Sequence, residues 1–544
     1  MTKTTTRPQG HAEALPISTS FDPISLNVFR NLFSSVADEM GISLQRTAFS
    51  PNIKMRRDFS CGIFDDQSRL LAQAAHIPVH LGAMTATVNA VLGSMELNQG
   101  DVAILNDPFA GGTHLPDISL VSAAFDDDGR LLGYVTNRAH HSDVGGMTPG
   151  SMPLATDTFQ EGLTIPPVKL VERGKLNQAV MSLILRNVRT PEEREGDLVA
   201  QLAAQTAGQR GLLQITGRYG IEETRRQAQA LIRYSRSMVE SLIEAIPDER
   251  WTGEDRLDGD GITEGSIRLA VTITKTSARS LAVDFRDTDA QAVGPVNAVR
   301  AVTEAALLYV IRTLIDEDIP VNAGTSEPVS LLTRPGTVVD ALPPAAVSAG
   351  NVETSQRIVD VLFKALAPAL PDRVPAASQG TMNNLSFGGW DGRRGRPFAY
   401  YETMGGGMGA RPDGDGMPAV HDHMSNTLNT PVESLETEYP IRVRRYEIVR
   451  ESGGPGLHTG GDGVRRDIEF LEPATVSIIS ERRVFRPYGL KGGEPGATGV
   501  NMIITEGVEH RLPAKSILSV DAGDIVRVVT PGGGGHGVKE TADG

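Results

Sequence analysis

Apolar positions recur along the chain with two periods, one typical of helices and one typical of strands. In residues 25–40 apolar side chains return every three to four positions, which predicts an amphipathic helix, and Gly41 is expected to end it. The stretch DFSCGIFDDQSRLLAQ (58–73) alternates around the turn DDQS and predicts a β-hairpin. Residues 79–95 return to the helical period, and DVAILNDP (101–108) predicts a short strand.

A second hairpin is predicted at residues 118–141, with DDDG as its turn. NDPFAGGTHLPD (106–117) leads into its first strand, and its second strand runs into NRAHHSDVGG (137–146). Antiparallel strands joined by a short turn bring the residues at their outer ends together. The two segments, each with His and Asp, are therefore expected to meet at the open end of one hairpin.

The rest of the chain predicts separate blocks of helices and hairpins, which favours an α+β fold over a doubly wound α/β fold. We expect several units, because 544 residues exceed what one compact core usually holds. The predicted division is a flexible N-terminal tail or clasp on a partner at 1–21, an α+β region at 22–190, a helical segment at 191–250, a central α+β region at 251–438 and a β-rich C-terminal region at 439–544.

Composition narrows the class of protein. The formal net charge of -15 argues against nucleic-acid binding, which needs a basic face. The sequence contains no run of about eighteen apolar residues, so no membrane-spanning helix is predicted. A single cysteine, Cys61, cannot form an internal disulfide and favours a reducing cytoplasm, as does the lack of an apolar signal segment at the N-terminus. The 58 glycines fall in pairs and triplets inside strand-like segments, which predicts tight turns and close backbone approaches.

The two His/Asp segments predict a divalent metal site. His114 and Asp117, joined by His140 or His141, offer two imidazoles and one carboxylate, a set that suits Zn²⁺, Mn²⁺ or Fe²⁺ and leaves positions for water or substrate. Neighbouring strand residues face opposite sides, so one of His140 and His141 is expected to bind the ion and the other to point elsewhere, for example to substrate. The competing interpretation makes these histidines hydrogen-bonding turn residues.

Two acidic residues are further candidates. Asp58 stands beside two arginines, so a local ion pair competes with a ligand role. Asp143 is a candidate general base, or a carboxylate that orients a ligand histidine, against a turn-capping role.

Other catalytic motifs are absent from the sequence. There is no Walker A string and no G-x-S-x-G, and Cys61 lies mid-strand, where a buried small hydrophobe is expected rather than a reactive thiol. HDH at 421–423 opens a polar loop that is a candidate pocket wall. If the reaction uses a nucleotide, this chain has no evident motif that would bind it.

These motifs together resemble the hydantoinase B/oxoprolinase family over nearly the whole chain, from about Asp22 to Gly537. The segments that carry the resemblance are SPNIKMRRDFSCGIFD, IPVHLGAM, NDPFAGGTHLPD, NRAHHSDVGG, PVNAV, AGNVETSQRIVD, SQGTMNNLSFGG, HMSNTLNTPVESLETEYP and SGGPGLHTGGDGVRRDIEF.

The resemblance implies a B-type subunit that works with a hydantoinase A-type subunit, which uses ATP and Mg²⁺ to phosphorylate the substrate. It implies ATP-dependent opening of hydantoins, 5-oxoproline or other lactams, and a relation to subunits of acetone and acetophenone carboxylases. It also implies Zn or Mn held by Asp58, His114, Asp117 and either His140 or His141.

The leading hypothesis is therefore the metal-bearing subunit of an ATP-dependent cyclic amidohydrolase, a hetero-oligomer with its A-type partner. His141 and Asp143 are the expected catalytic groups beside the metal. Carboxylation of a ketone by a related complex, and a non-catalytic scaffold with a structural His cluster, remain as alternatives.

Overall fold

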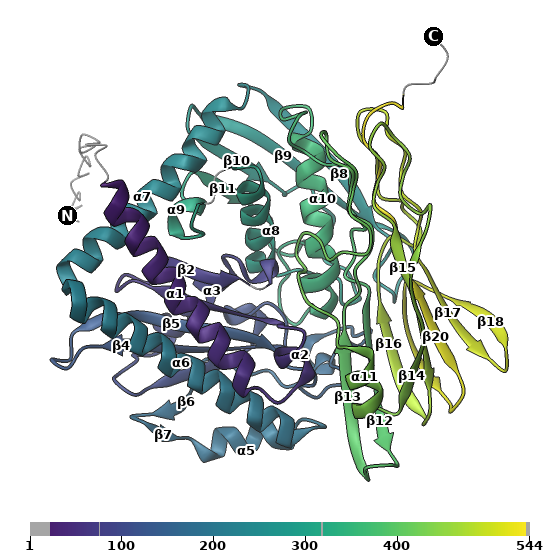
Figure 1. The fold of residues 1–544 in the computed structure, drawn as a ribbon, viewed down its shortest axis with the longest axis horizontal. Helices are drawn as coiled ribbons and strands as arrows, with labels where there is room; N and C mark the ends of the chain where they lie inside the picture. Colours follow the sequence, from purple (N-terminus) through teal and green to yellow (C-terminus); the bar gives the residue numbers. More distant parts are fainter. Residues whose placement is uncertain (1–21, 76, 317–318, 540–544) are drawn as a thin grey trace, which may run out of the picture.

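The computed structural model describes residues 22–75, 77–316 and 319–539, whose strands form four sheets with separate helical blocks (Figure 1). The predicted α+β fold is confirmed. The tail expected at residues 1–21 lies outside the described residues.

A seven-stranded antiparallel sheet carries both predicted N-terminal hairpins. Its strand order is β2-β1-β5-β4-β3-β6-β7, so the two hairpins lie side by side in the sheet. The bounds of these strands are β1 Phe59–Phe64, β2 Leu70–Ala75, β3 Val102–Leu105, β4 Asp117–Phe125, β5 Leu131–His140, β6 Val168–Glu172 and β7 Lys175–Leu176.

Helices cover both faces of this sheet. α1 (Pro23–Thr47), α6 (Pro191–Tyr219) and α7 (Ile221–Ala245) pack on one face and bury the apolar positions of β1 and β5, including Cys61. α3 (Ala83–Ser94) packs on the other face. A strand with both sides covered buries every residue, which matches the fully buried β1.

α1 extends beyond the end expected at Gly41. Gly41 is buried within the helix, and the next turn places Leu44 in the same core as Met40. The helix ends at Thr47, and a Pro follows at position 51. Apolar burial of the last turns outweighs the cost of one helical glycine, about 1 kcal/mol.

The central region forms a second, four-stranded sheet in the order β11-β10-β9-β8, covered by α8 and α10. Its elements are β8 Arg250–Leu257, β9 Ile267–Ser277, β10 Ser280–Asp284, β11 Val329–Leu332, α8 Arg300–Thr313 and α10 Ser355–Leu366. A π-helical turn, Gly350–Thr354, leads directly into α10.

The C-terminal part is a pair of packed sheets, ordered β13-β12-β16-β19 and β14-β15-β20-β17-β18, with one apolar core between them. β12 and β13 precede residue 439 in sequence, yet β12 pairs with β16, so strands of the two predicted regions share a sheet. The bounds are β12 Asn384–Asp391, β13 Arg396–Glu402, β14 Ile441–Val449, β15 Gly463–Phe470, β16 Ala474–Ile479, β17 Val500–Thr505, β18 Val508–Leu512, β19 Lys515–Val520 and β20 Ile525–Val529.

Glycine-rich segments near residues 405–409, 453–461, 489–496 and 532–537 pack backbone against backbone beside these sheets. A Cβ on Gly460 would lie 2.0 Å from the carbonyl oxygen of Gly533, and one on Gly407 would lie 1.9 Å from that of Gly461. Hydrogen bonds from Gly533 N to Gly461 O (2.9 Å) and from Gly461 N to Met408 O (2.8 Å) link neighbouring segments. The close backbone approaches expected from the glycine content are present.

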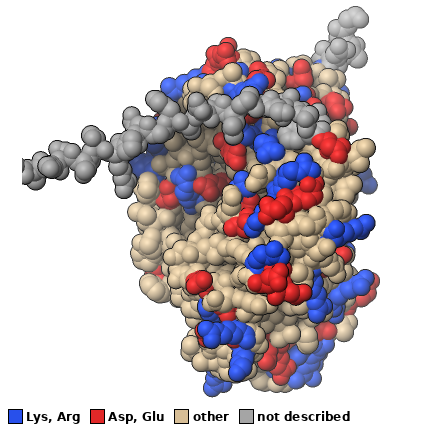
Figure 2. Space-filling model, turned by 90° about the vertical axis from the view of Figure 1, so that its left-hand side faces the viewer, with Lys and Arg blue, Asp and Glu red and all other residues tan. Residues whose placement is uncertain are grey.

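Short elements complete the described chain. None of the described helices is long and apolar enough to cross a membrane. On the face in Figure 2 the described acidic and basic side chains are interspersed. The remaining elements are α2 Pro51–Lys54, α4 Thr158–Glu161, α5 Gln178–Arg186, α9 Ala323–Ser326, α11 Val432–Glu438 and the 3-10 turns Pro78–His80 and Pro108–Ala110.

Candidate metal centre

The register of the second hairpin places Asp117 directly opposite His140, at the open end of β4 and β5. Residues opposite each other in an antiparallel pair point to the same face of the sheet. Arg138 lies two residues before His140 in β5, so its side chain points to the same face. Its Nη2 donates a hydrogen bond to Thr87 Oγ1 of α3 (2.6 Å), which shows that α3 covers this face. The expected meeting of the two segments is confirmed.

His114 reaches the same point from the loop before β4. After the 3-10 turn Pro108–Ala110, Gly111 adopts a left-handed conformation (φ +94°). A Cβ on Gly112 would lie 2.6 Å from the carbonyl oxygens of Asn106 and Asp107, so only glycine fits there. The glycine pair therefore folds the loop tightly enough to turn His114 back toward Asp117.

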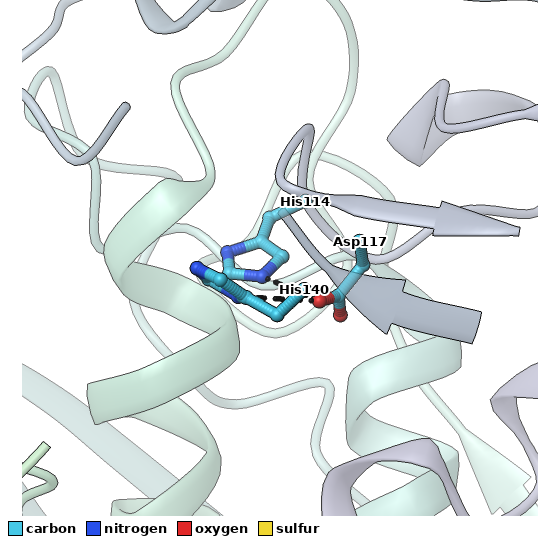
Figure 3. Close-up of side chains that lie close together, drawn as sticks. All are labelled: His114, Asp117 and His140. Atoms are coloured by element: carbon cyan, nitrogen blue, oxygen red, sulfur yellow. Dashed lines mark ion pairs between the residues drawn. The ribbon is translucent and has the colours of Figure 1, made fainter. Parts of the chain in front are cut away.

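The three side chains converge on one carboxylate oxygen (Figure 3). Asp117 Oδ1 lies 3.1 Å from His114 Nε2 and 3.3 Å from His140 Nδ1. All three side chains are at most 3% exposed. Within the described chain this is the one group of three His, Cys, Asp or Glu side chains whose ligand atoms lie within 4.8 Å of one another.

The second oxygen of Asp117 is held by the surrounding protein. Asp117 Oδ2 accepts hydrogen bonds from Thr113 Oγ1 (2.8 Å) and Asn351 Nδ2 (3.4 Å), and it lies 3.3 Å from His80 Nε2. The other ring nitrogen of His80 contacts Ser60 Oγ of β1 at 3.0 Å. Oδ2 is thus fully engaged, and Oδ1 is left facing the two histidines.

The orientation of His114 is set from the central region. Its Nδ1 lies 3.2 Å from the carbonyl oxygen of Ser348, which can only accept, so Nδ1 carries the proton. Ser348 is itself held by Glu161, whose Oε1 accepts from the backbone N–H groups of Val347 (2.9 Å) and Ser348 (2.8 Å). A metal-binding histidine usually donates its other N–H to a carbonyl or carboxylate in this way.

The cluster has the stereochemistry of a cation site. In a neutral His114 the Nε2 lone pair faces a carboxylate oxygen, and neither atom has a hydrogen-bond partner within the described chain. Such a contact is favourable only with a positive charge between the two atoms. Two atoms bound to one zinc ion at tetrahedral angles lie about 3.3 Å apart. The observed separations of 3.1 and 3.3 Å fit that value, so the group can hold a divalent metal ion.

The protonation states also suit metal binding. Burial alone would raise the pKa of Asp117, but the positive potential of His114 and His80 holds this pKa well below its usual range. Burial lowers the pKa of His140 and keeps its ring neutral. Burial would likewise lower the pKa of His114, but the Asp117 charge outweighs it and raises this pKa. A metal replacing that extra proton must bind to the deprotonated ring, which makes binding pH-dependent.

Asp58 lies next to this cluster without joining it. Its backbone carbonyl accepts from His140 N (3.0 Å), and its Oδ2 lies 3.5 Å from Asn52 Nδ2. With Asp117 and His140, Asp58 lines a small cavity of about 20 Å³. Among the described residues, Asp58 forms no ion pair with Arg56 or Arg57.

His141 points to the opposite face of the sheet, toward α6. Its Nε2 lies 2.9 Å from Gln201 Oε1, and its backbone N–H donates to Pro116 O (2.8 Å). Burial, together with the nearby positive charge of Arg194, lowers the pKa of His141 to about 4. Of the two adjacent histidines, His140 is the one that the structure brings to Asp117.

Asp143 is engaged in a local turn and does not belong to the cluster. Its Oδ1 accepts from the backbone N–H groups of Gly145 (3.1 Å) and Arg189 (3.0 Å), and its Oδ2 pairs with Arg189 Nη1 at 2.9 Å. The carboxylate is buried and neutralised by this arginine. These contacts match the turn-capping interpretation of Asp143.

The cavity wall contains residues that were not among the predicted ligands. His80, Asn351 and Tyr401 come from three distant parts of the chain, and the Tyr401 ring stacks on His140 at 4.4 Å between centroids. Ser425 and Thr427, from the polar loop that begins with HDH, also line it. The sequence did contain a signal for His80 and Asn351, because both lie in motifs that carry the family resemblance.

A larger cleft of about 770 Å³ lies elsewhere, between α2, the α5–α6 connection and β13. Pro51, Lys54 and Met55 of the α2 region line this cleft. On the other side of the same turn, Asn52 donates from Nδ2 to His140 O (2.6 Å). α2 therefore separates the larger cleft from the metal centre.

Known sequences resemble this chain over nearly its full length. It is 43% identical to an uncharacterised protein of Methanocaldococcus jannaschii, covering 95% of this chain and 91% of that protein. It is 39% identical to 5-oxoprolinase 1 of Arabidopsis thaliana, with 95% and 42% covered, so it spans about two fifths of that protein's length. It is 31% identical to a putative B-type subunit of a D-/L-hydantoinase from a Pseudomonas species, with 95% and 90% covered.

Solved structures share the fold. The ATP-dependent caprolactamase from Pseudomonas jessenii superposes with a TM-score of 0.86 at 28% identity, covering 95% of this chain and 92% of that one. The nucleotide-free acetone carboxylase gives a TM-score of 0.85 at 18% identity, with 95% and 76% covered, which shows a common fold. The family model described as hydantoinase B/oxoprolinase matches residues 22–539. The chain belongs to the hydantoinase B/oxoprolinase family.

Proposed function

We propose that this chain is the metal-bearing subunit of an ATP-dependent cyclic amidohydrolase that opens the ring of a hydantoin, of 5-oxoproline or of another lactam. The observation that carries the proposal is the buried convergence of His114 Nε2 and His140 Nδ1 on Asp117 Oδ1. The names of its relatives, which include 5-oxoprolinases, a putative hydantoinase and a caprolactamase, support the substrate class.

In this proposal His114, Asp117 and His140 hold one divalent ion, zinc or manganese. Such an ion, when bound, polarises a carbonyl group and lowers the pKa of water beside it. Ser348 orients His114, and Thr113 and His80 orient Asp117, so the ligand atoms are positioned in advance. Asp58, in the wall of the adjoining cavity, stays a predicted fourth ligand.

ATP is assigned to a partner subunit of the hydantoinase A type. The chain has no Walker A motif, and it corresponds to about two fifths of the Arabidopsis 5-oxoprolinase. Phosphorylation of the amide oxygen activates the carbonyl carbon, so that addition of water and cleavage of the C–N bond would give a ring-opened acyl phosphate. Hydrolysis of that acyl phosphate releases phosphate and makes the opening irreversible, which matters because a ring-opened product recloses easily by proximity. Activation by the partner and hydrolysis at the metal centre would then be separate tasks of one hetero-oligomer.

The catalytic roles of His141 and Asp143 remain predictions. His141 lies against α6 and Asp143 is paired with Arg189, so either role would need these contacts to change when substrate and partner are bound. Asp143→Asn tests the point directly, because it removes the charge and keeps the shape.

The proposal is tested with purified chain, an A-type partner, ATP and a panel of cyclic amides. The wild-type chain is expected to contain about one divalent ion and to support ring opening. Asp117→Asn should lose the ion and lower kcat/KM by more than about a hundredfold, because a neutral amide cannot replace the charged ligand. Asp143→Asn, the matched control outside the cluster, should retain the ion.

Two outcomes would replace the proposal. Full activity of a chain without bound metal leaves a scaffold role and moves all chemistry to the partner. Retention of carbon label from bicarbonate in the product, with a ketone as substrate, identifies a carboxylase instead.

A further inference from the structure

The cleft of about 770 Å³ between α2, the α5–α6 connection and β13 has the size and the wall of a ligand site. Clefts of this volume hold ligands of drug size when apolar walls surround a few polar groups. Much of the wall here is apolar: Phe49, Met55, Leu185, Val188, Pro397 and Phe398. Phe49 is 66% exposed, so an aromatic ring faces solvent beside the cleft. The apolar surface is thus available to a ligand.

Glu193 contributes a carboxylate oxygen without a partner to this wall. Its Oε2 pairs with Nη2 of the buried Arg194 at 2.8 Å, and none of the hydrogen bonds among the described residues uses its Oε1. Arg194 Nη2 is shared with Asp197 Oδ2 at 3.0 Å, so Arg194 neutralises Glu193 only in part. Burial, reinforced by the Asp197 charge, raises the pKa of Glu193 despite Arg194. A cationic donor in the cleft would stabilise this carboxylate.

Two hydroxyl groups of the wall lie near Glu193. Thr190 precedes the first turn of α6 without capping it, and its buried Oγ1 has no hydrogen-bond partner in the described chain. Burial and the nearby charge of Glu193 raise the pKa of Tyr439 well above its usual range, and no hydrogen bond of the described residues involves its hydroxyl. Hydroxyl and carboxylate oxygens all accept hydrogen bonds. This part of the wall can therefore receive an ammonium group.

The exposed part of the wall has free charges of mostly the opposite sign. Lys54 at the end of α2 and Arg186 at the end of α5 are exposed, and neither is in an ion pair of the described residues. The other two basic residues of the wall, Arg189 and Arg396, each pair with a carboxylate. Among the acidic residues of the wall only the exposed Glu192 lacks an ion pair within the described chain. Two free cations against one free anion favour a negatively charged group here.

We propose that the cleft binds amphipathic zwitterions, in which an apolar body separates an ammonium group from a carboxylate. The ammonium group lies against Glu193 Oε1 and the two hydroxyl groups, the apolar body lies on the apolar wall, and the carboxylate lies toward Lys54 and Arg186. ω-Amino carboxylates are the simplest members of this class. Opening of an unsubstituted lactam also yields an ω-amino carboxylate, and only that connection rests on the proposed function.

The two ends of such a ligand contribute unequally. A fatty acid would leave Glu193 Oε1 unpaired, whereas an alkylamine would leave Lys54 and Arg186 in water. Exposed cations lose little in that way, because solvent screens them. The Glu193 side chain is only 26% exposed, so its partner is worth more. The ammonium end is therefore expected to provide most of the specificity.

The test measures the binding of 8-aminooctanoate, octanoate and octylamine to the purified full chain by calorimetry, without partner or ATP. The three probes share one chain length and differ in their charged ends. The variants are Glu193→Gln and Arg186→Gln. Glu195→Gln is the matched control, because Glu195 is an exposed acidic residue of α6 outside the cleft wall. Asp117→Asn separates this site from the metal centre.

8-Aminooctanoate should bind wild-type chain at least about tenfold more tightly than octanoate, and Glu193→Gln should remove that advantage. It should bind about two- to fivefold more tightly than octylamine. Arg186→Gln should weaken 8-aminooctanoate by about the same factor and leave octylamine unchanged. Glu195→Gln and Asp117→Asn should bind all three probes as wild type does.

Equal affinity for the three probes would indicate an unspecific apolar surface and overturn the proposal, as would the absence of binding. Loss of binding in Asp117→Asn would place the ligand at the metal centre and overturn it too. If Glu193→Gln does not fold, the three probes on wild type and Arg186→Gln still decide. None of these measurements involves ring opening, so the cleft proposal and the proposed function can fail separately.

Discussion

His80 contacts the metal centre but was not among the ligands predicted from the sequence motifs. It comes from the 3-10 turn before α3 and links Ser60 of β1 to Asp117 through its two ring nitrogens. One oxygen of Asp117 is thereby occupied, and the other remains for a cation. Without an imidazole at this place Asp117 would have more freedom to rotate, so His80 acts by positioning a ligand.

His80→Phe should weaken metal binding while preserving the ligand set. Removing a group that orients a ligand usually lowers metal affinity by about ten- to a hundredfold. The measurement is competition for the ion by a chelator of known affinity. His510→Phe, in exposed β18, is the control and should leave the affinity unchanged. An affinity equal to that of wild type would show that Thr113 and Asn351 suffice to orient Asp117.

Glu353 illustrates the energetic cost of a buried charge near the site. Its Oε1 accepts from Asn384 Nδ2 (2.7 Å) and Met382 N (3.2 Å), but Oε2 has no hydrogen-bond partner in the described chain. Burial, reinforced by the nearby charge of Glu481, raises its pKa to about 8. Between the usual glutamate pKa of about 4.5 and about 8, the folded state retains a proton that the unfolded state has lost.

This linkage predicts how Glu353→Gln changes stability with pH. Glu353 makes the wild-type free energy of unfolding fall as pH rises from about 4.5 to about 8. Gln keeps the acceptor oxygen and has no charge, so the variant should gain at least about 1 kcal/mol over wild type at pH 8.5 relative to pH 5. Urea unfolding at both pH values measures the gain. The same difference at both pH values would mean that Glu353 does not titrate in this range.

At the scale of elements, the glycine-rich segments behave as one packed unit. Gly460, Gly533 and Gly453 each lie so close to a neighbouring carbonyl that a Cβ would fall within 2.1 Å of it. Backbone carbonyls cannot move aside as a flexible side chain can. The absence of side chains, rather than unusual φ angles, is what these positions require.

Gly460→Ala should therefore destabilise the protein by more than about 3 kcal/mol, because the added methyl would overlap Gly533 O, 2.0 Å away. Gly217→Ala is the matched control: it lies in α6 with nothing within 4 Å of the added Cβ. That change should stabilise by about 0.5–1 kcal/mol, since alanine favours the helix. Thermal unfolding of both variants measures these changes in stability. Equal changes for the two variants would contradict the packing argument.

At the scale of the whole molecule, Arg56 joins the N-terminal sheet to the C-terminal strands. From its buried position after α2, it donates to Tyr401 O (2.7 Å), Thr403 Oγ1 (2.9 Å) and Leu428 O (3.2 Å). The Leu428 N–H donates back to Arg56 O at 3.0 Å. One guanidinium thus ties the segment that leads from α2 into β1 to the segments that close the cavity beside the metal centre.

Arg56→Lys should lower the free energy of unfolding by about 2–4 kcal/mol, because a single ammonium group cannot reach three acceptors arranged for a guanidinium. Arg57→Lys, at the exposed neighbouring position, should change it by less than about 0.5 kcal/mol. Denaturant titrations of the two variants give the comparison. A similar small effect for both would show that the arginine fork does not hold these parts together.

Local patterns along the chain were enough to predict the helices and strands and part of the site. Alternation around DDDG predicts the hairpin 118–141, and an antiparallel hairpin necessarily brings Asp117 and His140 together. The choice between His140 and His141 could not be made that way, because period-2 alternation shows that they face opposite sides but not which side carries the partner residues.

Hairpin pairing, helix periods, the His/Asp ligand set and the close glycine contacts are thus encoded in short segments, since each depends on residues near one another in the chain. The contacts of Ser348 with His114 and of Asn351 with Asp117 each join positions 234 residues apart. No local period carries that information, because it depends on how the central region packs against the N-terminal sheet. Tertiary packing alone therefore settled which nitrogen of His114 holds the proton, which oxygen of Asp117 is free, and that the Asn351 NH₂ group is turned toward Asp117.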